Sequence, residues 1–131
     1  MRIFKTTWFT RFAAKEGITD GELRELVDQL EAGEADADLG GGVYKMRLAR
    51  PGEGKSGGYR IIVFFRSEER TFYEYCFAKS KRSNISKKML KSYKEVAKEY
   101  LFMTPEQLRE KIEKGKFIEL EGGEDEIQVR P

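Results

Sequence analysis

The chain has 131 residues, enough for one domain with a real hydrophobic core and too few for two ordinary domains. A single cysteine, Cys76, excludes an internal disulfide and fits the reducing conditions of the cytoplasm, where we expect the protein to be located. No apolar stretch approaches the ~20 residues that span a membrane, and residues 1–9 lack a signal-peptide pattern, so we expect no membrane partner.

The net charge of +2 conceals a strong asymmetry along the chain. Residues 1–39 have five basic and nine acidic side chains, a balance of −4. Residues 40–103 have fifteen and six, a balance of +9, and residues 104–131 have five and eight, a balance of −3. A positive centre between acidic ends is typical of a polyanion site. A solvated lysine-rich surface is the alternative.

The apolar pattern predicts the first elements in chain order. A short strand at Ile3–Phe4 precedes a helix over residues 8–17. Thr19–Glu22 has the form of a capping box and begins a second helix, which Gly33 can end. Both helices carry an apolar face, so we expect them to contribute to the core and not to the chemistry.

The period changes to two from Val43, which predicts strands. Residues 59–66 form a near-continuous apolar run, typical of a central strand buried on both faces, and residues 71–78 form a third strand. The order predicts an α+β fold: a strand, two helices, a three-stranded meander and a helix. We expect a small, mostly antiparallel sheet with helices over one face.

Capping residues define the C-terminal elements. Ser83 or Asn84 is expected to cap a third helix, on whose apolar stripe Tyr93 and Tyr100 are expected to be core residues. Thr104–Gln107 is another capping box, with proline at the first helical position. It begins a short helix that a glycine ends, and an edge strand is expected to follow.

Residues 40–60 hold the most informative pattern, with seven glycines and five basic residues around a strand. Lysine and arginine are the side chains that contact phosphate. Residues 49–56 fit a relaxed phosphate-loop pattern, but a nucleotide-binding loop must open a helix. Here Lys55 and Ser56 are followed by two glycines and the apolar run, which predict a turn and a strand. We therefore reject the nucleotide site.

The stretch GGGVYKMRLARPGEGKSGGYRIIVFF, followed by FAKSKRSNI, resembles the RelE/ParE superfamily of bacterial toxins, and most closely its RelE-like and HigB-like branch. The matching features are a basic strand, the loop with the pattern PGxGKSGG, a Gly-Tyr-Arg start to the central strand, and a basic cluster after the last strand. The resemblance spans residues 1–120, which we expect to form a single domain, and leaves residues 121–131 as a disordered acidic tail.

The resemblance implies the toxin of a type II toxin–antitoxin system, neutralised by an antitoxin that we expect to carry a DNA-binding helix-turn-helix. RelE-like toxins cleave mRNA on the ribosome, which makes ribosome and mRNA the other expected partners. The ParE branch instead inhibits DNA gyrase without nuclease activity, and the shared fold does not decide between them. An RNA-binding module without catalysis is a third possibility.

The chain contains no histidine, so imidazole acid–base catalysis is closed to it. It also lacks a Cys/His ligand set, and we expect no metal or other cofactor. Metal-free RNA cleavage by lysine, arginine and tyrosine remains: attack of the ribose 2′-OH on the phosphorus, stabilised by arginine charge. The resemblance assigns the catalytic roles to Arg60, Lys55 and Lys79. RNA binding is assigned to Arg47, Lys45, Arg50, Lys81 and Arg82.

Overall fold

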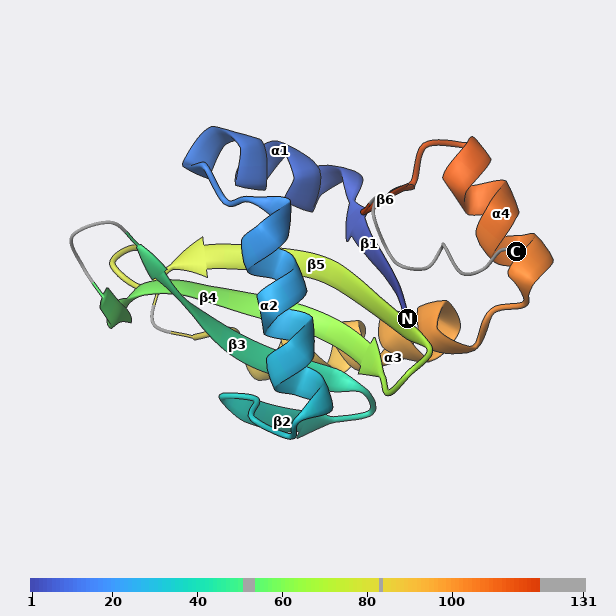
Figure 1. The fold of residues 1–131 in the computed structure, drawn as a ribbon. Coiled ribbons are helices and arrows are strands. Elements are labelled where there is room, and N and C mark those ends of the chain that lie inside the picture. Colours follow the sequence, from blue (N-terminus) through green and yellow to red (C-terminus); the bar gives the residue numbers. More distant parts are fainter. Residues whose placement is uncertain (51–53, 83, 121–131) are drawn as a thin grey trace.

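The computed structural model describes residues 1–50, 54–82 and 84–120, which form a six-stranded sheet and four helices (Figure 1). The strands are β1 (Arg2–Thr6), β2 (Ala37–Gly40), β3 (Val43–Arg50), β4 (Gly54–Arg66), β5 (Arg70–Ala78) and β6 (Phe117–Glu119). The helices are α1 (Thr7–Glu16), α2 (Asp20–Glu31), α3 (Lys87–Phe102) and α4 (Pro105–Glu113). The order is β2-β3-β4-β5-β1-β6, and only the β1–β5 pair is parallel. The predicted α+β class is confirmed.

The first two helices form as predicted, because local capping signals define their ends. The hydroxyl of Thr6 accepts from the backbone of α1, and Gly17 ends that helix in the left-handed conformation, with φ of 77°. Thr19 and Glu22 make both hydrogen bonds of the capping box at the start of α2. These interactions satisfy donors that a helix end would otherwise leave unpaired.

The start of α3 differs from the expectation. Ser86 is the N-cap, and its hydroxyl accepts from the backbone N–H of Met89, so Asn84 does not cap the helix. Ser83, the other expected cap, lies outside the described residues. The capping box of α4 is present as predicted, with Thr104 and Gln107 exchanging hydrogen bonds. Pro105 occupies the first turn, where its missing N–H costs nothing.

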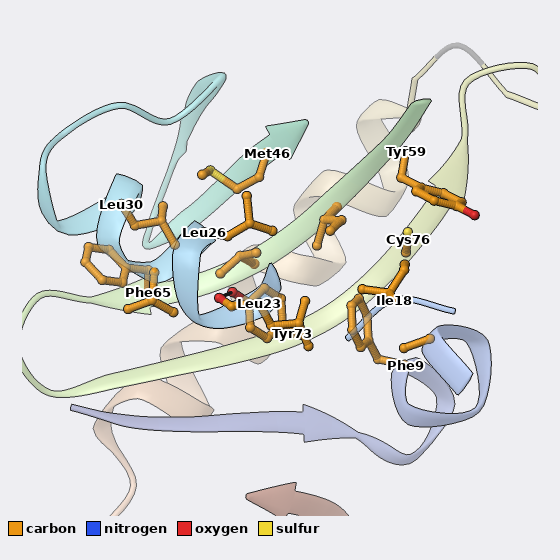
Figure 2. Close-up of a cluster of buried hydrophobic side chains, with 14 of the residues drawn as sticks. Phe9, Ile18, Leu23, Leu26, Leu30, Met46, Tyr59, Phe65, Tyr73 and Cys76 are labelled. Carbon is orange, nitrogen blue, oxygen red and sulfur yellow. Dashed lines mark hydrogen bonds between the residues drawn. The ribbon is translucent and has the colours of Figure 1, made fainter. Parts of the chain in front are cut away.

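The helices cover both faces of the sheet, and the expectation that they cover one face is wrong. Figure 1 shows α2 crossing one face while α3 lies behind the other. Successive β4 residues alternate between the two cores, because side chains of a strand point to opposite faces. Ile61, Val63 and Phe65 pack with α1 and α2, as Figure 2 shows for Phe65 beside Leu30, whereas Ile62 and Phe64 pack under α3.

The three glycines that open the basic stretch form the β2–β3 turn and pack under α3. Gly40, Gly41 and Gly42 all have positive φ, between 64° and 90°. A β-carbon on Gly42 would lie 2.6 Å from Cδ1 of Leu101, so only glycine fits there. The turn is at the opposite end of β3 from Arg50, about 25 Å away at the rise of a strand. These glycines therefore serve the fold, as a turn with positive φ that packs under α3.

Strand β2 was not predicted, because it is a short polar edge strand with no apolar alternation. The expected acidic tail at residues 121–131 lies outside the described part of the chain. In that part, no helix is both long and apolar enough to cross a membrane.

Candidate functional site

Two arginines face each other across the centre of the basic region. Arg47 of β3 is directly opposite Arg60 of β4, which is in turn opposite Phe77 of β5. Directly opposed residues of an antiparallel pair have β-carbons about 5 Å apart. Strand alternation places this arginine pair (Arg47 and Arg60) on the α3 face, together with Lys45. Two opposed arginines on one face make this part of the sheet strongly positive.

Arg60 is buried within that face. Its residue is 3% exposed, and its Nη1 donates to the backbone oxygen of Tyr59 at 3.3 Å. A charge held in a low-dielectric interior acts strongly on its surroundings, because little water screens it. The structure therefore places Arg60 beneath the surface, and its partner Arg47, with a side chain 48% exposed, is the one that solvent reaches.

An acidic residue from outside the basic stretch neutralises part of this positive charge. Nε of Arg47 lies 2.8 Å from Oδ1 of Asp36, and Nζ of Lys45 lies 4.0 Å from the other carboxylate oxygen. Asp36 immediately precedes β2, the strand that the sequence pattern did not reveal. The contact holds the guanidinium of Arg47 in one orientation over the sheet.

The second basic cluster lies at the same end of the sheet. Lys79, Lys81 and Arg82 are all exposed in the turn after β5. The backbone N–H of Lys79 donates to the carbonyl of Gly58, two residues before Arg60, at 2.9 Å. The turn is thus tied to the beginning of β4, and the two basic segments are neighbours in space.

The remaining predicted residues are placed differently from one another. Lys55 belongs to β4, which confirms that no helix follows the loop, but its side chain lies outside the described part of the structure. The guanidinium carbon of Arg50 lies 5.6 Å from the ring centre of Tyr59, whose ring packs on the α1 side of the sheet. Arg50 is therefore on the opposite face from the arginine pair.

Tyr93 and Tyr100 are core residues, as expected. Both rings pack against Phe64 under α3. Burial raises the pKa of each hydroxyl to about 12, so neither ionises near neutral pH.

Sequence reasoning missed Glu74 of β5. Ile62 pairs with Tyr75 and Val63 with Tyr73, so Glu74 is the extra residue of a β-bulge. Burial raises the pKa of its carboxyl to about 7, and its Oε1 is enclosed with no hydrogen-bond donor among the described residues. A lone acid inside the apolar segment FYEYCFA was the available signal. Among the described residues, no three metal-ligating side chains come together.

A comparison with known protein families identifies a family for this chain. Residues 1–120 match the model of a family described as the RelE toxin of the RelE / RelB toxin-antitoxin system. The match covers the whole described fold, including the arginine pair and the turn after β5.

Proposed function

Because the chain belongs to the RelE toxin family, and is thus a toxin of a toxin–antitoxin system, we propose that it inhibits translation by cleaving mRNA on the ribosome. The observation that carries this proposal is the arginine pair: Arg47 and Arg60 in register on one sheet face, with the exposed cations of residues 79–82 at the same end. This arrangement suits a polyanionic backbone bent around a single reacting phosphate.

The proposed cleavage needs no metal. The ribose 2′-oxygen loses its proton, attacks the adjacent phosphorus and displaces the 5′-oxygen, which takes up a proton. Arg47 contacts the phosphate, and buried Arg60 adds positive charge from beneath as the phosphorane develops. Lys55 and Lys79 are the candidates for the two proton transfers, since a lysine amine can accept a proton and its ammonium form can donate one.

The outer cations have a different proposed role. The RNA backbone or the ribosome is held by Lys45, Lys81 and Arg82. Arg50 does the same from the opposite face of the sheet. Contacts of this kind contribute affinity that falls steeply with salt, and they carry no chemistry.

The test is primer extension on mRNA from cells in which the toxin is induced. Cuts at in-frame positions with new 5′-OH ends are expected for the wild type. Arg47→Ala should reduce cleavage by on the order of 10²–10³, the usual scale for losing a preorganised charge. Arg109→Ala, on the exposed surface of α4, is the matched control and should cleave normally.

Two outcomes would refute the proposal. Intact mRNA together with DNA-damage signalling would instead indicate a gyrase-inhibiting toxin of the ParE type, and salt-sensitive ribosome binding without cuts would indicate a binding module.

Because Arg60 is buried, its variant should be Arg60→Lys, which keeps the charge, and its melting curve must match that of the wild type before its activity is compared.

A further inference from the structure

A pocket of about 460 Å³ opens where β1 ends and α1 begins. The pairing of β1 with β5 stops at Lys5 and Tyr73, so past that point β5 keeps its pairing with β4 but has no partner from β1 on its other edge. The bulge at Glu74 coincides with this end of the pairing. The walls of the pocket are Trp8, Glu74, Tyr75, Tyr100 and Lys116, with Thr6 and Thr7. We call it the acid pocket.

The carboxyl of Glu74 lacks a hydrogen-bond donor on one of its oxygens in this pocket, among the described residues. Its Oε1 is enclosed and accepts no hydrogen bond from the described residues. The two threonine hydroxyls are already committed, since Thr6 donates to the backbone oxygen of Glu74 and Thr7 donates to the backbone oxygen of Gly115. A ligand that fits must therefore bring its own donors to the carboxyl.

A cation satisfies the acid pocket better than a neutral donor. Burial without a countercharge is what disfavours the ionised carboxylate, and a bound cation removes that penalty while it donates hydrogen bonds. The aromatic walls suit a flat, weakly hydrated cation, because guanidinium groups stack on rings and pair with carboxylates. Trp8, 45% exposed and 4.9 Å from the ring of Tyr75, gives the pocket an accessible aromatic rim.

We propose that the acid pocket binds the guanidinium group of an arginine side chain of the antitoxin. RNA is not the fitting occupant, because it carries no cation at neutral pH and its phosphates would be repelled by the carboxylate. The pocket also lacks the cations of a cleavage site, since Lys116 is the single cation among its lining residues. This proposal rests on the antitoxin that family membership implies, and it is independent of RNA cleavage.

The test is the affinity of purified toxin for its cognate antitoxin, measured by calorimetry. Glu74→Gln keeps the shape of the side chain and removes its charge, and it should weaken binding roughly 10- to 100-fold, as loss of one member of a close interfacial charge pair does. Glu25→Gln, an exposed acid on α2, is the matched control and should bind like the wild type. Equal affinity of the wild type and Glu74→Gln would overturn the proposal, as would equal losses in both variants.

The pH dependence gives a second readout that a merely structural role would not produce. The cation binds the ionised carboxylate, whose pKa is about 7, so wild-type affinity should rise about tenfold between pH 6 and pH 8 relative to Glu74→Gln. The other titratable groups that face the carboxyl are Tyr75, Tyr93, Tyr100 and Lys116. The pKa values of Tyr93 and Tyr100, at about 12, lie far outside this range.

Replacing the arginines of the antitoxin one at a time identifies the partner. One replacement should weaken binding to the wild type yet cause little further loss with Glu74→Gln, the signature of a direct pair in a double-mutant cycle. Additive losses for every arginine would overturn the proposal.

Discussion

The β-bulge at Glu74 makes a quantitative prediction about stability. The folded-state pKa of its carboxyl is about 7, above the ordinary value of 4.5. An acid with a raised pKa binds its proton more tightly in the folded state, so stability is fully present at low pH and is lost as the pH rises from 4.5 through 7. Each pH unit in that window is worth about 1.4 kcal/mol, so the ionised carboxylate costs the fold at most about 3 kcal/mol at pH 8.

Glu74→Gln removes the ionisation and keeps the shape. The variant should match the wild type at pH 4.5 and become more stable than it as the pH rises, by up to about 3 kcal/mol at pH 8. Urea denaturation at half-unit steps of pH measures the difference, with Glu25→Gln as the control for a generic loss of negative charge. A difference that stays constant across the whole range would refute the reasoning, because only a titrating group can produce the slope.

Two further predictions concern the β2–β3 region. Gly42→Ala should lower the free energy of unfolding, measured by urea denaturation, by about 2–4 kcal/mol, because it combines a positive φ with a β-carbon 2.6 Å from Leu101. Gly33→Ala is the control: Gly33 has a similar φ but open space around it, so the loss should be only about 1 kcal/mol. Equal losses would mean that the contact with α3 has no effect. Asp36→Asn should leave stability within about 1 kcal/mol and steepen the salt dependence of ribosome binding by about one phosphate contact, because Arg47 is released. An unchanged salt slope would refute this role of Asp36.

Local signals predicted most of the fold, because they act within a few residues. The capping boxes at Thr19 and Thr104 and the change of period at Val43 all produced the expected elements. The predicted N-cap of α3 was wrong, because three of the four residues before the helix are polar and each can cap a helix. Packing decides among them. Ile85 packs against the core under α3, which leaves Ser86 as the residue at the helix end.

The site depends on information that spacing in the sequence does not contain. That Arg47 and Arg60 share a face follows from alternation, but that they stand opposite each other depends on the register of β3 and β4. Register also explains why Glu74 was missed: the skip between Ile62 and Val63 is what turns its side chain into a pocket. Burial of Arg60 likewise depends on tertiary packing, which the spacing of residues in the sequence does not contain.

The acidic and basic segments of the sequence are less separated in the folded structure than along the chain, and this affects which substrate the arginine pair can bind. Asp36, from the acidic first third, pairs with Arg47 and Lys45, so a phosphate must displace a carboxylate before it reaches the arginine pair. Exchange of one anion for another gains less free energy than binding to an open cation, which lowers the affinity for any single phosphate. A substrate that makes several contacts at once, with the pair and with the turn at residues 79–82, recovers that loss. Such a substrate is RNA held in place by a larger assembly, which agrees with the proposed cleavage on the ribosome.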